Sequence, residues 1–270
     1  MKYPKNLEYV KASQDASDNL DMSTKITCVE LNEAITDEWG VKYSKDGRKL
    51  LRAPLVLNGF YSIKKGVRII CDEAFWALWS LRSLVIPDSV TSIGDRAFCW
   101  CKSLHRIVIP DSVTSIGDGA FAGCHSLTDI VIPDSVTSIG DGAFHECYSL
   151  SSLVIPNSVV NLKGNPFADW NGELKCLSPY FIYDNKVLFD KDKNAIFSFR
   201  DKDATSYVIP DSVTRIENGA FYGCRFLSSI VIPSSVTSIG EHAFDGCNFS
   251  YDFKQKLSSR FGTGIFEATF

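Results

Sequence analysis

Cysteine and histidine side chains can bind metal ions or act as a nucleophile and its base, and this 270-residue chain has nine cysteines and four histidines. The segments nearest to a metal-ligand set are Cys124-His125 and His145-Glu146-Cys147. Neither has a further cysteine or histidine at the C-x-x-C or H-x-x-x-H spacing of a zinc site, and no G-x-S-x-G motif occurs. We therefore predict no catalytic residue, no metal ion and no cofactor, and we interpret the chain as a non-enzyme.

Aspartates recur in two rows, and a row of acids raises the question of a calcium site. One row follows prolines and the other precedes an Ala-Phe pair: Asp88, Asp111, Asp134 and Asp211, and then Asp95, Asp118 and Asp141. Aspartate after proline is common turn chemistry, and an acid is favoured where a helical turn begins. No EF-hand loop or nonapeptide calcium repeat is present. We therefore interpret both rows as structural.

These residues recur because the chain is built from a repeat of 23 residues. Proline and phenylalanine each return at this spacing, with one interruption: Pro87, Pro110, Pro133, Pro156, Pro210 and Pro233, and Phe75, Phe98, Phe121, Phe144, Phe167, Phe221 and Phe244. Three close copies run from Leu84 to Ser152, and one of them reads IVIPDSVTSIGDGAFAGCHSLTD. With degenerate copies on either side, starting at Tyr61, the pattern predicts about seven coils.

The apolar residues of one unit predict how a coil is built. Residues 104–109 alternate as in an extended strand, and Pro110 then begins a turn. A second extended segment follows at 113–116, and residues 120–124 indicate a short helical turn that closes the coil. Because stacked coils align like residues, we predict a repeat solenoid, mainly β with short helical turns and parallel strand ladders. Cysteines at one repeat position then fill the core: Cys101, Cys124, Cys147, Cys224 and Cys247.

The unit L-x-x-I-x-I-P-x-S-V-T-S-I-G-x-x-A-F-x-x-C-x-S resembles the BspA-like leucine-rich repeats of host-associated bacteria and some parasitic protists. The resemblance covers about residues 60–252. It implies a right-handed leucine-rich-repeat coil and a non-catalytic protein-interaction module. Surface-displayed members of that family are associated with adhesion to host proteins, so an adhesin-like module that binds host proteins or glycans is implied. The alternative is an intracellular scaffold or assembly protein that binds an endogenous partner.

The solenoid is expected to occupy the middle of the chain. We predict an N-terminal segment, cap and hairpin at residues 1–59 and the repeat solenoid at residues 60–252. A hairpin insert interrupts the solenoid at about residues 176–206, between the fourth coil and the next proline repeat. A C-terminal cap helix and tail follow at residues 253–270.

Two hairpins and two caps depart from the repeat. Residues 41–51 and 180–199 each place alternating apolar residues on either side of a turn, which predicts a hairpin. Residues 253–261 place an apolar residue at every fourth position, which suits an amphipathic helix over the open end of the core. We expect residues 22–40 to cover the other end. The apolar residues of that cap are Val29, Leu31, Ile35 and Trp39.

Charge and the N-terminal sequence limit the classes of partner. The formal net charge is -4 and the pI is near 5.6, with no basic run, so we predict no nucleic-acid partner. Residues 1–20 contain no apolar stretch of the length that a signal peptide or membrane helix requires, so we expect no membrane insertion. As written, the chain reads as cytoplasmic, or as secreted or surface-displayed if a leader was removed. The oligomeric state is not encoded in these patterns.

The remaining candidates for a functional site are residues on the surface of the solenoid. Trp76, Trp79 and Trp100 lie in the variable closing turns, and tryptophan is enriched at binding hot spots. They are predicted either to bind a protein or glycan partner or to pack beneath the N-terminal cap. The solvent-facing positions of the first strands complete the predicted site, although a solvated β surface would show the same pattern. These positions are Arg82, His105, Arg106, Val108, Asp129 and Val131.

Overall fold

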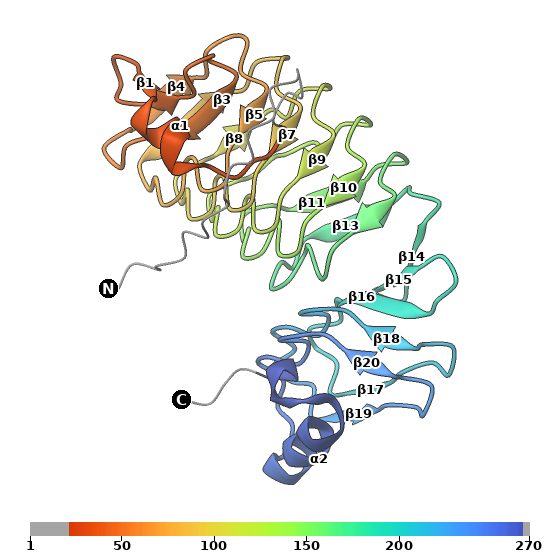
Figure 1. Cartoon of the computed structure of the whole chain (residues 1–270). Helices are drawn as coiled ribbons and strands as arrows, with labels where there is room; N and C mark the ends of the chain where they lie inside the picture. Colours follow the sequence, from red (N-terminus) through yellow and green to blue (C-terminus); the bar gives the residue numbers. More distant parts are fainter. Residues whose placement is uncertain (1–21, 267–270) are drawn as a thin grey trace, which may run out of the picture.

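The computed structural model describes residues 22–266 and forms a β-solenoid of about eight turns (Figure 1). The predicted repeat solenoid with parallel strand ladders is therefore confirmed. A typical coil contains a first strand, a turn that begins at proline, a second strand, and a closing turn such as residues 118–127 that leads to the next coil. Residues 1–20, for which the sequence analysis predicted neither a signal peptide nor a membrane helix, lie outside the part that the structure describes.

The second strands form a ladder of eight strands in the order β1-β2-β3-β5-β7-β9-β10-β12. Strands β1, β2 and β3 pair antiparallel, and every later pairing is parallel. From β5 onward each step joins residues 23 positions apart, because one coil equals one repeat. The strands are β1 (Ile35–Thr36), β2 (Lys42–Tyr43), β3 (Lys49–Arg52), β5 (Ile69–Ile70), β7 (Ser92–Ile93), β9 (Ser115–Ile116), β10 (Ser138–Ile139) and β12 (Asn161–Leu162).

The first strands form shorter parallel ladders on another face of the coil. Their pairings are β4-β6-β8, β11-β13 and β17-β19, and a single bridge from Arg106 to Asp129 continues the first of them. The strands are β4 (Gly59–Ser62), β6 (Leu81–Val85), β8 (Arg106–Ile107), β11 (Ser152–Ile155), β13 (Glu173–Cys176), β17 (Ser206–Val208) and β19 (Ser229–Val231).

The predicted hairpin insert is a three-stranded meander. Strands β14 (Phe181–Asp184), β15 (Val187–Asp190) and β16 (Ala195–Phe199) pair antiparallel, and β16 then pairs parallel with β18 (Arg215–Ile216). Strand β20 (Ser238–Ile239) continues that ladder. The N-terminal strands use the same arrangement, since the last strand of their meander also becomes the first rung of a parallel ladder. The insert therefore restarts the solenoid.

Strand β16 separates two hydrophobic cores. All five of its residues are buried. Leu188 and Phe197 pack into the core of the first half, whereas Phe189, Ile196 and Phe199 pack into the core of the second half. The pairing of β15 with β16 has a register shift between Leu188 and Phe189, so Phe197 and Phe199 point into different cores although they are two residues apart. Strands β15 and β16 thus form one wall that both cores share.

Phenylalanine rings stack along each core. In the first half the centroids of successive rings are 5.2 to 6.2 Å apart and their planes are nearly parallel. The rings are Phe75, Phe98, Phe121, Phe144 and Phe167, followed in the second half by Phe199, Phe221 and Phe244. One ring per coil at the same position holds the coils in register.

The N-terminal cap lies beside the second-strand ladder. Helix α1 (Cys28–Asn32) and its flanks pack against a small cluster of Leu51, Ile69 and Cys71. Ile69 and Cys71 stand where the next coil has Ser92 and Gly94, so the ladder is apolar on this side where the helix covers it.

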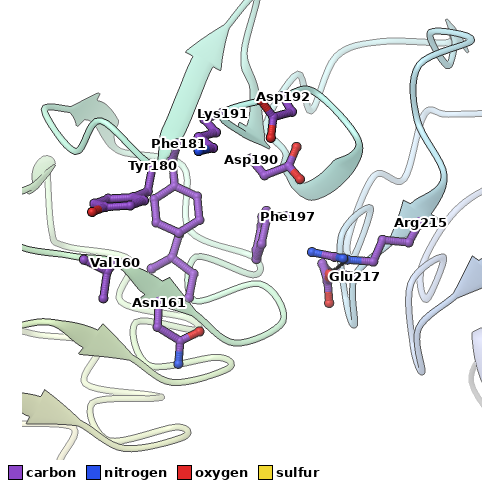
Figure 2. Close-up of a pocket in the computed structure, with 11 residues that line it drawn as sticks. Val160, Asn161, Tyr180, Phe181, Asp190, Lys191, Asp192, Phe197, Arg215 and Glu217 are labelled. Carbon is purple, nitrogen blue, oxygen red and sulfur yellow. Dashed lines mark hydrogen bonds and ion pairs between the residues drawn. The ribbon is translucent and has the colours of Figure 1, made fainter.

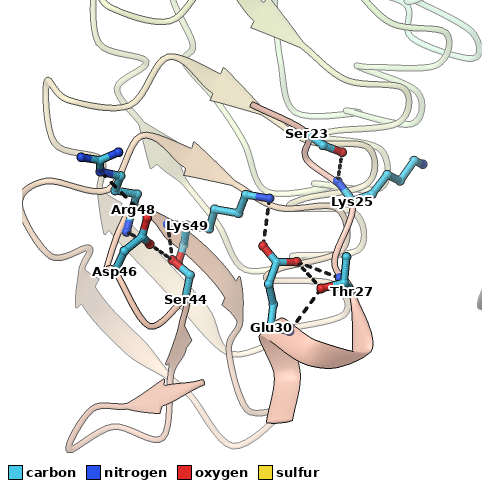
Figure 3. Close-up of polar contacts among 8 residues, drawn as sticks. All are labelled: Ser23, Lys25, Thr27, Glu30, Ser44, Asp46, Arg48 and Lys49. Carbon is cyan, nitrogen blue, oxygen red and sulfur yellow. Dashed lines mark hydrogen bonds and ion pairs between the residues drawn. The ribbon is translucent and has the colours of Figure 1, made fainter. Parts of the chain in front are cut away.

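Helix α1 is fixed by polar contacts with the first hairpin (Figure 3). Thr27 and Glu30 form a capping box, in which the Glu30 carboxylate accepts the Thr27 backbone amide at 2.8 Å. The same carboxylate forms an ion pair with the buried Lys49 ammonium at 2.9 Å.

The prediction for the apolar residues of this cap was largely wrong. Val29, Ile35 and Trp39 are exposed, and Leu31 is the one that packs against the cluster. The five-residue helix presents a single short face to the ladder, so Val29 points to solvent, while Ile35 in β1 and Trp39 in the following turn lie outside the helix.

The C-terminal cap closes the second core. Helix α2 (Tyr251–Phe261) buries Leu257 and packs Phe253 and Phe261 against that core. A short 3-10 helix, η1 (Thr263–Ile265), adds the buried Ile265. The predicted cap helix is therefore present at the open end of the solenoid.

Candidate functional site

Each closing turn contains two backbone positions in the left-handed conformation. In the third full repeat both are glycines, Gly119 and Gly123, with φ of 60° and 70°. At the second position other coils carry Trp100, Glu146 and Asp169, with φ of 63°, 55° and 50°. A side chain costs about 1–2 kcal/mol in this conformation. These three side chains, and Ala77 with φ of 59°, are thus held where the backbone itself favours glycine.

The three predicted tryptophans gather on the first closing turns, and we call Trp76, Trp79 and Trp100 the tryptophan face. Trp76 is 37% exposed and Trp79 is 58% exposed, so the alternative that they pack beneath the N-terminal cap is wrong. The Lys102 ammonium lies 5.7 Å from the Trp79 ring centroid and 5.2 Å from the Trp100 ring centroid. It joins the two rings by cation–π contacts.

The position of the Trp100 ring requires a glycine at residue 123 of the next coil. A Cβ atom added at Gly123 would lie 2.6 Å from Cε3 of Trp100, so the ring covers bare backbone. The Trp100 ring then meets His125 edge to face, with centroids 5.6 Å apart. The tryptophan face therefore continues into the third closing turn.

A polar group follows the tryptophan face, and we call His125, His145, Glu146, Tyr148 and Asp169 the polar end. Glu146 lies between the two imidazoles, 3.7 Å from Nε2 of each. The His125 and Tyr148 rings are 5.2 Å apart, and the Tyr148 hydroxyl donates to Asp169 at 3.4 Å. Burial, and then the charges of Glu146 and Asp169, raise the pKa of Tyr148. The group offers carboxylate, imidazole and phenol in one place.

Sequence reasoning considered His125 and His145 only as metal ligands and missed this group. The signal was the 23-residue spacing itself, because Trp79, Lys102, His125 and Tyr148 occupy one repeat position in four successive coils. Residues at one position stack above one another in a solenoid. The position of Glu146 between two imidazoles follows from the fold and has no signal in the spacing.

The remaining predicted residues lie on the first-strand face. All six are exposed: Arg82, His105, Arg106, Val108, Asp129 and Val131. A row of valines 42–70% exposed runs along the same face in both halves, at Val85, Val108, Val131, Val154, Val208 and Val231. The tryptophan face and the first-strand face are consecutive in the chain, since the closing turn leads directly into the first strand.

The ladder cysteines point inward. The thiols of Cys101, Cys124 and Cys147 donate to backbone carbonyls of the phenylalanine positions at 3.1 to 3.2 Å. Burial raises the pKa of Cys101 and of Cys147 to about 12. These three cysteines form no disulfide. Because these thiols are buried and protonated, their free state says nothing about whether the surroundings are oxidising or reducing.

The second aspartate row is a hydrogen-bond ladder. Asp72, Asp95 and Asp118 each accept, at 2.9 to 3.1 Å, the backbone amide of the residue at the same position in the next coil. Asp141 accepts the amide of Asn165 in the same way at 2.8 Å. These carboxylates are engaged with the backbone, and within residues 22–266 no three histidine, cysteine or acidic side chains converge as a metal-ligand set.

A pocket of about 270 Å³ opens where the two halves meet (Figure 2). Phe181 and Phe197 form its apolar part, and Arg215 pairs with Glu217 on the opposite side. Asp190 on its rim accepts the amides that close the β15–β16 turn. Its charged groups are thus largely used within the fold. No helix among the described residues is long and apolar enough to cross a membrane.

The fold and the ladders define a leucine-rich-repeat solenoid. More particularly, the chain belongs to the BspA type leucine rich repeat family, whose model matches six copies over residues 61–177 and 195–269. The gap between the two matched segments contains strands β14 and β15.

Solved structures of bacterial repeat proteins share the fold. A leucine rich cell surface protein of Faecalibacterium prausnitzii is 30% identical with a TM-score of 0.55, covering 71% of this chain and 59% of that one. The pneumococcal vaccine antigen PcpA is 24% identical with a TM-score of 0.58, covering 78% and 51%. A leucine-rich repeat protein of Eubacterium ventriosum is 24% identical with a TM-score of 0.53, covering 71% and 68%. The chain thus spans between half and three fifths of the first two proteins. A search of curated proteins finds no match.

Proposed function

We propose that the chain is a non-catalytic interaction module that binds a protein or glycan partner through the tryptophan face and the adjoining first-strand face. The observation that carries the proposal is Trp100. A large ring stands at a left-handed position where Gly123 and Gly246 stand in other coils, and it lies beside the exposed Trp79. Backbone strain of this kind concentrates at functional sites, and exposed tryptophans are enriched at binding hot spots.

One further observation supports an adhesin-like role outside the cell. The Faecalibacterium relative is described as a cell surface protein. Its 30% identity makes a related role a reasonable proposal for this chain. The buried, protonated cysteines suit an oxidising environment as well as a reducing one, so they raise no objection to export.

The repeat itself supplies variants that test the proposal without disturbing the fold. Trp76→Ala, Trp79→Asn and Trp100→Gly each introduce a residue that another coil carries at the same position, as in Ala122, Asn248 and Gly123. We expect immobilised extracellular-matrix proteins or glycans to retain the wild-type chain and to lose the triple variant, while circular dichroism stays unchanged. Retention of both proteins alike would overturn the proposal.

A further inference from the structure

The closing turns present a continuous row of contacts across four coils. Trp79 and Trp100 both contact Lys102, Trp100 contacts His125, and His125 contacts Tyr148. Trp79, Lys102, His125 and Tyr148 are each 23 residues apart, so they lie one coil apart, which is about 4.8 Å in a strand ladder, and Trp100 lies in the same turn as Lys102. We call these five residues the ring row.

The ring row changes character along its length. Trp79 offers an exposed aromatic face at one end, and Tyr148, which is 56% exposed, offers another at the other end. Beside Tyr148 lie the carboxylates of Glu146 and Asp169, which can accept hydrogen bonds from hydroxyl groups. Aromatic rings thus line the row, and hydrogen-bond acceptors lie at its Tyr148 end.

A pyranose ring matches this pattern. It has an apolar C–H face that stacks on an aromatic ring and a rim of hydroxyls that donate to carboxylates, and a sugar unit in an extended β-linked chain is close to one coil in length. We infer that the ring row binds a neutral linear glycan that lies along the solenoid axis, an inference that rests on the proposed function.

Charge favours a neutral glycan over a polyanion. Lys102 is the cation of the ring row, and its ammonium is already directed to two ring faces. Glu146 and Asp169 at the polar end would repel sulfate or uronate groups.

The test is a titration with defined saccharides. Neutral hexasaccharides of β-linked glucose, mannose, xylose and N-acetylglucosamine, and a heparin hexasaccharide, are titrated into the full chain by calorimetry with tryptophan fluorescence as a second readout. At least one neutral saccharide should bind. Trp79→Asn and Trp100→Gly should each weaken that binding by about thirtyfold, as expected for a hot-spot aromatic.

Two matched variants separate the ring row from the rest of the surface. Glu146→Gln keeps the size of the side chain and should weaken the neutral saccharide by about tenfold, since a charged hydrogen-bond acceptor becomes a neutral one. Tyr251→Ser removes an aromatic that is 74% exposed on the C-terminal helix and should leave the affinity unchanged.

The outcomes distinguish this inference from the proposed function. If no neutral saccharide binds, or if heparin alone binds, the glycan inference is wrong. The proposed function survives that result if a matrix protein binds the wild type and is lost from the tryptophan variants. It fails together with the inference if the tryptophan variants change the binding of neither class.

Discussion

Gly123 shows how single residues of the closing turn depend on one another. Its φ is 70°, and the Trp100 ring occupies the space where a Cβ atom would stand. Gly123→Ala should therefore lower the free energy of unfolding by about 2 kcal/mol or more, from the backbone conformation together with the displaced ring. Urea unfolding monitored by circular dichroism measures the change.

A double-mutant cycle separates the two causes. In a Trp100→Gly background the ring is absent, so Gly123→Ala should cost only the backbone part, about 1 kcal/mol. An equal cost in both backgrounds would show that the ring does not rest on Gly123.

Asp141 is a second residue whose environment makes a measurable prediction. Burial raises its pKa to about 6, because the charged carboxylate is removed from water, and Asp118 adds like-charge repulsion. A raised pKa in the folded state means that the native protein binds the extra proton between about pH 4 and pH 6. The contribution of Asp141 to stability is therefore present below about pH 4 and is lost as the pH rises through 6.

Asp141→Asn should remove this dependence. Asn218 occupies the same ladder position in the second half and accepts the Glu241 amide at 3.0 Å, so asparagine fits the hydrogen bond. We expect the variant to be more stable than wild type by about 1–2 kcal/mol at pH 7 and equal to it near pH 4. Chemical unfolding at both pH values provides the measurement, and a stability gain that is the same at both would contradict the assignment.

The repeat position of the candidate residues could be read from the sequence, but their mutual arrangement could not. The positions of Trp79 and Trp100 in variable closing turns follow directly from the 23-residue period. The direction of the Cys124 thiol, inward to a backbone carbonyl, and the place of Glu146 between two imidazoles depend on how adjacent coils stack. The 23-residue spacing shows which residues of adjacent coils lie above one another. It does not show where their side chains point, and the contacts between coils depend on those directions.

At the scale of elements, strand β16 is the unit that joins two cores. Phe197 meets Phe181 edge to face in the first core, with centroids 5.3 Å apart. Phe199 stacks on Phe221 in the second core at 4.9 Å. Phe197→Ala and Phe199→Ala should each cost about 3–4 kcal/mol, because each leaves a cavity in a close-packed core.

Hydrogen exchange can assign each loss to its own half. Phe197→Ala should reduce amide protection mainly in strands β10 and β12, and Phe199→Ala mainly in strands β18 and β20. Loss of protection in the same strands for both variants would show that β16 belongs to one core.

The sequence revealed the hairpin β15–β16 but not the strand β14 before it. Asn185 and Lys186 join β14 to β15, both with positive φ as a type I′ turn requires, yet the Asn-Lys pair lacks the glycine that marks such turns. The N-terminal cap was misjudged for a related reason. Ile69 and Cys71, standing in place of Ser92 and Gly94, are what show where helix α1 lies, and this departure becomes visible only when the coils are aligned.

The whole molecule is one solenoid with an internal restart. The period predicted its architecture because every coil repeats the same strand, turn and closing turn, so local and global signals agree. The two halves also touch directly on the closing-turn side, where the Asn165 side chain donates to the Gly219 carbonyl at 2.8 Å. Shared strands and such contacts together predict that the two cores unfold as one cooperative unit.

Arg200 provides the test of that coupling. Its buried guanidinium donates to the Gly172 carbonyl at 2.8 Å and lies 4.4 Å from the centroid of the Trp170 ring, so a residue that follows β16 is anchored in the first half. Arg200→Ala removes the hydrogen bond and the stacking together, which should cost about 2 kcal/mol or more. The lost interactions lie at the junction between the two halves and not in either core.

We therefore expect calorimetry of the wild type to give a single transition whose van't Hoff and calorimetric enthalpies agree, and Arg200→Ala to broaden or split it. Lys186→Ala serves as the control, since its ion pair with Asp201 is exposed and should add little to stability. Two separate transitions already present in the wild type would mean that the shared wall of β15 and β16 does not couple the halves. A single sharp transition in Arg200→Ala would mean that strands β15 and β16 couple the two cores without the arginine, because each coil is stabilised by its contacts with the next.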